Sequence, residues 1–315
     1  MGKADSYSKD LVQRDEYFAD TVNNTVFEGK VVVRPEELTE LDTTELTIVE
    51  TVVNDSVPVQ KYRDVLKQAV IRKDDKAIYA IIGIENQTTV HYAMPVKCLL
   101  YDSIRYAKQV EKTAAAHRKK KTRRASGAEF LSGWYKEDKL LPIITITVYF
   151  GAEEWDGPKS IHEMFEDTVD ESILKIVPNY EIHLLEPRKV VDWDSFQSDI
   201  GLLFHAIAVA NENRGIDELF LRQPDKFKRV DNRIVNAIDF FTHSKYSVNS
   251  EEEETDMSYA AKTSEAHAII GAFVDIGKTL EETIEYLSKR FKNDKDINKE
   301  YITEEYNSCL RAKNK

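Results

Sequence analysis

The chain has 315 residues, 42% of them apolar, and a formal net charge of −12. These values allow one large or two modest domains with a sizeable core, and the lack of any run of about 18 apolar residues excludes a membrane span. The two cysteines show no paired spacing, and the polar N-terminus lacks the apolar region of a signal peptide. We therefore expect a cytoplasmic protein with neither a disulfide framework nor a zinc site.

The acidity is confined to the second part of the chain. Residues 1–125 carry a net charge of +2, whereas residues 126–315 carry −14. An acidic total taken alone argues against a nucleic-acid partner. The first part still has enough lysine and arginine for a local basic surface, so DNA remains a possible ligand.

The N-terminal half alternates predicted helices and strands. Residues 10–27 predict an amphipathic helix, because Leu11, Phe18 and Val22 recur at helical spacing. Residues 29–45 predict irregular structure. The apolar runs 62–71 and 77–87 flank a short charged turn, which indicates an antiparallel hairpin.

The next predicted element is a helix over residues 94–112, with an apolar stripe at Val96, Leu100, Ile104 and Ala107. A basic loop over 113–128 should follow. Residues 140–150 are β-branched and aromatic, which is typical of a buried central strand. A short helix capped by Ser160 and a last short strand over 181–187 complete this half.

The remaining sequence predicts helices. Four segments after residue 190 have helical periodicity, and the acidic stretch Glu251–Glu254 between them predicts a solvated loop. The outline is an α/β region over residues 1–190 and an all-helical region over 191–315.

Two acidic residues of the predicted hairpin are the candidate chemical site. Period-two geometry places Glu85 and Gln87 on one face of their strand, and strand pairing would bring Asp64 beside Glu85. Carboxylates at the end of an apolar strand are costly to bury without a cation, and Mg²⁺ prefers oxygen ligands. The alternative is a pair of ordinary strand-end acids that form ion pairs with Arg63 or Lys67.

Several long segments resemble the recombination-promoting nuclease family, whose members are often labelled transposases and belong to the PD-(D/E)XK superfamily. The matching segments occur in order over roughly residues 10–190 and include YRDVLKQAV, AIIGIENQTTVHYAMPVKCLLYDSIRYAKQV, EFLSGWYKEDKLLPIITITVYFG and WDGPKSIHEMF. The resemblance implies a restriction-endonuclease-like core, a mixed β-sheet flanked by helices, that cuts DNA with a divalent metal.

The resemblance also implies roles for individual residues. Asp64 resembles the motif aspartate and Glu85 the motif glutamate, while Gln87 stands where the superfamily usually has lysine. Asp20 resembles an acidic residue that members direct at the metal, and the alternative is an exposed helical acid. Glutamine can orient water but supplies no positive charge, so catalysis could be slow, more dependent on the metal, or absent.

Two groups of residues are candidates for DNA contact. The resemblance points to Arg105 and Tyr106, on the helix after the motif strand, and the alternative for Arg105 is a surface arginine paired with Asp102 or Glu111. The basic stretch is a second phosphate footprint, and the alternative there is a solvated loop. Its six residues are Arg118, Lys119, Lys120, Lys121, Arg123 and Arg124.

The leading functional interpretation is an endonuclease that hydrolyses DNA with Mg²⁺ or Mn²⁺ bound at the two motif acids. The alternative is a catalytically weak or inactive nuclease fold that binds DNA or another partner, favoured by the missing lysine and the acidic helical half. A true transposase has only the family label in its favour. The helical half could form a homodimer, which would give a nuclease two active sites.

Overall fold

The computed structural model describes residues 3–50, 56–62, 64–73, 76–120, 126–151, 153–212, 214–244, 246, 253–292 and 294–313. The chain divides into two compact units, Met1–Gly201 and Leu202–Lys315. Among the described residues, no helix combines the length and the apolar character needed to cross a bilayer.

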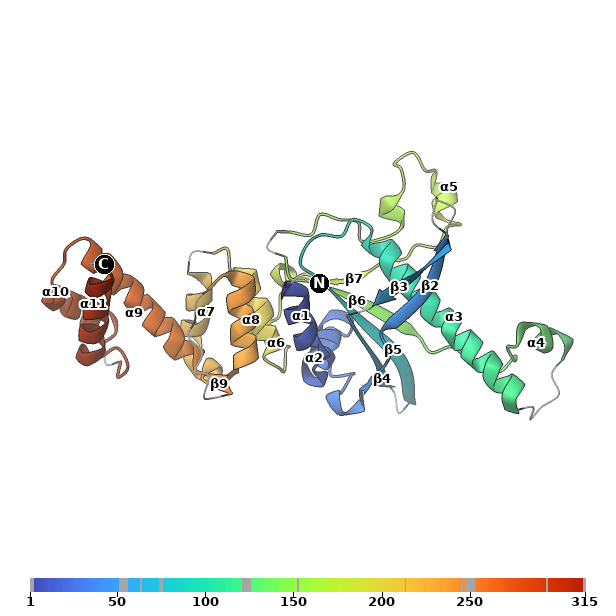
Figure 1. The fold of residues 1–315 in the computed structure, drawn as a ribbon, viewed down its shortest axis with the longest axis horizontal. Coiled ribbons are helices and arrows are strands. Elements are labelled where there is room, and N and C mark those ends of the chain that lie inside the picture. Colours follow the sequence, from blue (N-terminus) through green and yellow to red (C-terminus); the bar gives the residue numbers. More distant parts are fainter. Residues whose placement is uncertain are drawn as a thin grey trace. The chain divides into compact units, whose positions relative to one another are not determined.

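The first unit is built on a five-stranded mixed sheet with the order β1-β4-β5-β6-β7 (Figure 1). The strands are β1 (Thr39–Glu40), β4 (Val65–Lys73), β5 (Lys76–Gln87), β6 (Ile143–Tyr149) and β7 (His183–Leu185). β4 and β5 pair antiparallel, which confirms the predicted hairpin. β6 pairs parallel with β5 and with β7, so the predicted buried strand is confirmed and lies inside the sheet.

A parallel pair needs a long crossover connection, and here helices provide it. The connection between β5 and β6 contains α3 (Met94–Lys120) and the short α4 (Gly127–Ser132). The helix predicted over 94–112 is therefore confirmed but is longer. The predicted loop over 113–128 is wrong at its end, where Gly127 begins α4, and over residues 113–120, which extend α3. The stretch is rich in alanine and lysine, which are good helix formers, and its charges do not end the helix.

α3 packs on the sheet through a different face from the predicted one. Val96 is 47% exposed, whereas Cys98 and Tyr101 are buried. Asp102 is buried as well, because its carboxylate accepts hydrogen bonds from Thr145 Oγ1 at 2.6 Å and Tyr180 Oη at 2.7 Å. Because partners from distant segments satisfy this buried acid, the face of α3 that packs on the sheet includes Asp102 and differs from the purely apolar stripe that was predicted.

The N-terminal helix is interrupted. α1 (Lys3–Gln13) and α2 (Asp15–Val26) are separated by Arg14, whose backbone is extended. Leu11, Phe18 and Val22 are buried as predicted. The ammonium of Lys67 on β4 lies over the Phe18 ring and donates to the Asp15 carboxylate at 2.5 Å, so these helices pack against the sheet.

Smaller elements complete the first unit. The strands β2 (Thr44–Glu50) and β3 (Ser56–Tyr62) form a separate antiparallel hairpin that the sequence patterns did not predict. The short helix expected after Ser160 is a single 3₁₀ turn, in which Ser160 Oγ accepts from Glu163 N at 3.3 Å. That turn is η2 (His162–Met164), and the other short helices are η1 (Pro35–Glu37), α5 (Glu171–Leu174) and η3 (Pro187–Lys189).

The second unit is helical, as predicted. Its first helix, α6 (Ile200–Val209), begins two residues before the unit boundary at Leu202. The other elements are α7 (Gly215–Arg222), η4 (Pro224–Phe227), β8 (Val230–Asp231), α8 (Asn232–Thr242), β9 (Glu254–Thr255), α9 (Met257–Asp275), α10 (Leu280–Arg290) and α11 (Lys299–Lys313). An apolar cluster that includes Ile270, Leu287 and Ile302 joins α9, α10 and α11. Of the predicted acidic loop, Glu251 and Glu252 lie outside the described residues, and Glu254 pairs in β9 with Asp231.

Candidate functional site

The strand register places Asp64 beside Glu85. The β4–β5 ladder begins at the pair Val65↔Ile84, and Asp64 is the residue immediately before β4. Continuing the ladder by one residue puts Asp64 opposite Glu85, on the same face of the sheet. The carboxylate of Asp64 is held there because its Oδ2 accepts a hydrogen bond from the backbone N of Asn86 at 2.8 Å.

Glu85 is a buried acid in the middle of the sheet. Its side chain is only 1% exposed, and its neighbour on β6 is Thr147. Lys97, in the first turn of α3, extends to it, with 2.9 Å between Lys97 Nζ and Glu85 Oε2. The face of the sheet that carries Glu85 is therefore the face that α3 covers.

The electrostatics of this site favour a cation. Burial lowers the pKa of Lys97, but the attraction of Glu85, with smaller contributions from Tyr101 and Asp64, outweighs burial and raises the pKa above its ordinary value. The same surroundings act in the opposite sense on Cys98. Burial and the charge of Glu85 raise the pKa of that thiol to about 12, so Cys98 is a neutral thiol at physiological pH.

Gln87 shares the face of Glu85 through the period of the strand but has a local partner. Its Nε2 donates to the backbone oxygen of Asn86 at 2.8 Å. A positive charge does face this end of β5, from Lys97 on the neighbouring helix.

Asp20 has a set of partners far from the hairpin in sequence. Its carboxylate accepts from the backbone N of Gln197 at 3.0 Å, from Ser198 N at 2.8 Å and from Ser198 Oγ at 2.6 Å. Asn24 Nδ2 donates to it at 2.9 Å. Burial raises the pKa of Asp20 more than these hydrogen bonds lower it. The carboxylate therefore anchors the segment 195–198 to α2.

The residues that follow the motif strand have partners within the fold. Arg105 Nη2 donates to the backbone oxygen of Asp42 at 2.7 Å. The hydroxyl of Tyr106 accepts from the backbone N of Ile143 at 3.2 Å, at the first residue of β6. Both side chains are half-buried, and Tyr106 helps fix the start of β6.

The basic stretch begins on a helix. Arg118 and Lys119 are exposed in the last turn of α3, and Lys120 ends that helix. Lys121, Arg123 and Arg124 lie outside the described residues. Exposed cations that follow one another at a helix end can contact successive phosphates.

Sequence reasoning missed Lys97, because the expected apolar stripe through Val96 and Leu100 left it without a role. Met94, Cys98 and Tyr101 also follow helical spacing, and this second stripe is the buried one. Choosing it would have placed Lys97 beside the sheet and near the end of the motif strand.

The fold and the site define a mixed α/β protein with a buried carboxylate–ammonium pair near the end of its second long strand. The chain belongs to the family described as "Putative transposase, YhgA-like", whose model matches residues 32–231. The match includes every strand of the five-stranded sheet and all of α3. Comparison with curated proteins and with solved structures gave no match.

Proposed function

We propose that this protein is a metal-dependent endonuclease that hydrolyses phosphodiester bonds in DNA. The supporting observation is the meeting of Asp64 and Glu85 on one face of the β4–β5 hairpin, with the ammonium of Lys97 against Glu85. Membership of a family labelled as transposases is compatible with work on DNA. The resemblance to PD-(D/E)XK nucleases selects hydrolysis from among the reactions on DNA.

The donor set fits a hard divalent cation. Asp64 and Glu85 would hold it, because both offer carboxylate oxygens, and the attraction that raises the pKa of Lys97 also favours a bound cation. Mg²⁺ or Mn²⁺, when bound, supplies positive charge that lowers the pKa of a water and offsets charge on the cleaved phosphate. Asp20 is left out of this proposal, since its oxygens hold the segment 195–198.

The chain's own residues divide the remaining tasks. Asn86 N orients the Asp64 carboxylate, and the sheet fixes Glu85. Lys97 is 24% exposed at its side chain, so its ammonium can turn from Glu85 towards a phosphate oxygen and stabilise developing negative charge. Gln87 can orient the attacking water by hydrogen bonding.

DNA would reach this site along α3. Lys97 lies in the first turn of the helix, and the exposed Arg118 and Lys119 lie in its last turn. Phosphate contacts of this kind position a duplex without reading its sequence, so we propose little sequence preference. Arg105 and Tyr106, between these ends, support the sheet and are available to contact DNA only at their exposed atoms.

A second candidate is a DNA-binding protein without catalytic activity. The observation that favours it is the ion pair between Lys97 and Glu85, which neutralises the buried acid without any metal. Such a protein would bind DNA with a steep salt dependence but would leave it intact.

A plasmid assay distinguishes the two. We expect the full chain with Mg²⁺ or Mn²⁺ to nick supercoiled plasmid DNA, and we expect Asp64→Asn or Glu85→Gln to lower the rate by a factor of about 10² or more. Glu111→Gln, which changes an exposed acid on α3, is the matched control and should leave the rate unchanged. Equal, metal-independent cleavage by all four proteins would exclude the proposed activity.

The protein is also proposed to form a homodimer. Light scattering after size-exclusion chromatography tests this, and a strictly monomeric mass would exclude the homodimer.

A further inference from the structure

A second group of metal-binding side chains lies in the helical unit. α9 and α11 pack through the apolar cluster that contains Ile270 and Ile302. This packing brings His267 of α9 opposite two residues of α11, Glu305 and Cys309. Because these two are four residues apart, they lie on the same face of the helix.

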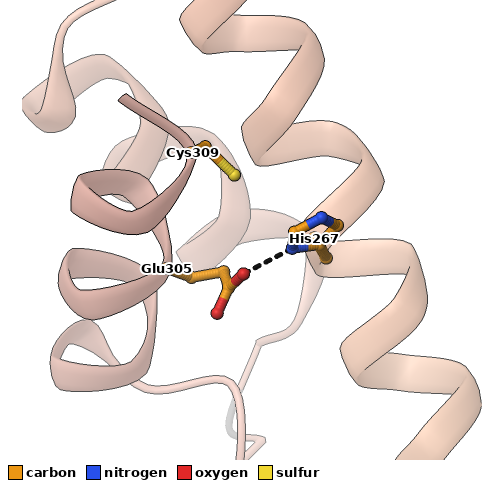
Figure 2. Close-up of side chains that lie close together, drawn as sticks. All are labelled: His267, Glu305 and Cys309. Carbon is orange, nitrogen blue, oxygen red and sulfur yellow. Dashed lines mark hydrogen bonds and ion pairs between the residues drawn. The ribbon is translucent and has the colours of Figure 1, made fainter. Parts of the chain in front are cut away.

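The three side chains point toward one another (Figure 2). His267 Nδ1 forms a hydrogen-bonded ion pair with Glu305 Oε1, and the ligand atoms of all three residues lie within 4.8 Å of one another. Zn²⁺ has bonds of about 2.0–2.3 Å, so the ligands of a tetrahedral site lie roughly 3–4 Å apart. Small side-chain rotations would therefore close the set around one ion.

The chemistry of the donors selects the type of ion. An imidazole nitrogen, a carboxylate oxygen and a thiolate sulfur are all zinc ligands, and thiolate disfavours Mg²⁺ and Ca²⁺. The His267 side chain is 58% exposed and that of Glu305 is 26% exposed, which leaves a path for the ion and room for a water as a fourth ligand. The oxygen-only pair Asp64 and Glu85 would prefer a different, harder metal.

We propose that His267, Glu305 and Cys309 bind a borderline-soft divalent metal such as Zn²⁺, which cross-links α11 to α9. The helical unit is then stabilised by metal binding, because an ion bound only by the folded state shifts the folding equilibrium. This proposal departs from the sequence analysis, which expected no zinc site because the cysteines lack paired spacing. The proposed ligands come from two helices that the fold brings together.

Cobalt is the most specific probe of the site. Chelator-treated full-length protein in an Asp64→Asn background, which removes the other proposed metal site, should show a thiolate-to-metal charge-transfer band when Co²⁺ is added. Cys309→Ser should abolish the band. Cys98→Ser, which changes the other cysteine of the chain, should retain it.

Zinc titration gives a second readout. We expect Zn²⁺ to raise the unfolding temperature of the same background protein, and we expect Cys309→Ser and His267→Ala each to weaken Zn²⁺ binding by at least about tenfold. Circular dichroism without metal shows whether each variant keeps its helices, and Glu305→Gln provides a third variant if one fails to fold. The absence of a charge-transfer band, or an equal band and equal Zn²⁺ affinity in Cys309→Ser, would overturn the proposal.

Discussion

Lys97 Nζ lies 2.9 Å from Glu85 Oε2, so the helix that crosses over the sheet supplies a cation that faces this buried acid. Two features of the sequence acquire a common explanation from this pair. In the proposed nuclease, Gln87 can be uncharged, because Lys97 already supplies a positive charge. Glu85 can be buried, because its charge is compensated.

Replacing Lys97 should affect both stability and cleavage. Lys97→Met removes the ammonium from a buried acid, and we expect a loss of about 2–3 kcal/mol in the free energy of unfolding, measured with urea. Cleavage should fall by a factor of about 10²–10³. Lys112→Met, at an exposed position of the same helix, is the control.

A double-mutant cycle tests the ion pair itself. The double variant Lys97→Met/Glu85→Gln should lose less stability than the sum of the losses in the two single variants. Strict additivity would mean that the pair contributes no coupling energy.

Placing the lysine of PD-(D/E)XK nucleases at position 87 tests the proposal that Lys97 serves in its place. In the wild-type background, Gln87→Lys should change the cleavage rate by no more than a few fold, because the charge is already supplied. In the Lys97→Met background, the same substitution should recover at least about tenfold in rate, since it returns a donor to the same face of the sheet. Gln87→Met in that background is the matched control. No recovery with lysine would indicate that Lys97 has only a structural role.

The exposed cations at the end of α3 should affect DNA affinity and leave the chemical step unchanged. For Arg118→Ala/Lys119→Ala, we expect weaker binding to duplex DNA and a salt dependence whose slope is smaller by up to about 2, one for each lost phosphate contact. Fluorescence anisotropy over a series of salt concentrations measures both. Lys292→Ala/Lys295→Ala, two exposed cations of the helical unit, should leave the slope as it is, and an equal change in the two double variants would contradict a footprint on α3.

The helical unit has its own buried acid, and its contribution should depend on pH. Burial raises the pKa of Glu265, but the interactions with Arg214 and Arg290 lower it by more than burial raises it. The pKa is therefore below its ordinary value of 4.5. A lowered folded-state pKa gives stability that is present above pH 4.5 and is lost as the pH falls through the folded value. Glu265→Gln should therefore lose about 2 kcal/mol at neutral pH. The difference from wild type should shrink at acidic pH, below 4.5.

Urea unfolding at the two pH values measures this difference. Glu281→Gln, at an exposed position of α10, should differ little from wild type at either pH. A gap between Glu265→Gln and wild type that stays constant from neutral to acidic pH would mean that the carboxylate charge does not stabilise the unit.

The hairpin that carries the candidate site was predictable because it depends on local signals. Two β-branched runs around a short charged turn specify β4 and β5, and strand period alone places Glu85 and Gln87 on one face. The position of Asp64 then follows from register. The interior strand β6 was predictable for a similar reason, since its β-branched run fits a strand buried on both faces.

The contacts that sequence reasoning missed depend on residues far apart in the chain. Asp102 is buried and accepts hydrogen bonds from Thr145 and Tyr180, which lie far along the chain, so the inward face of α3 could not be read from apolar spacing. Asp20 holds a segment around Ser198 that lies at the other end of the first unit in sequence. The role of Lys97 was missed for the same reason, because the wrong face of this helix was expected to pack on the sheet.

The most direct measurement of the central claim is a crystal structure of the full chain grown with Mn²⁺, with data collected to reveal the anomalous signal of manganese. We predict an anomalous peak bound by carboxylate oxygens of both Asp64 and Glu85, and no such peak in Asp64→Asn crystals grown in the same way. A wild-type structure in which the two carboxylates bind no common manganese ion, at a concentration that supports binding elsewhere on the protein, would contradict the account.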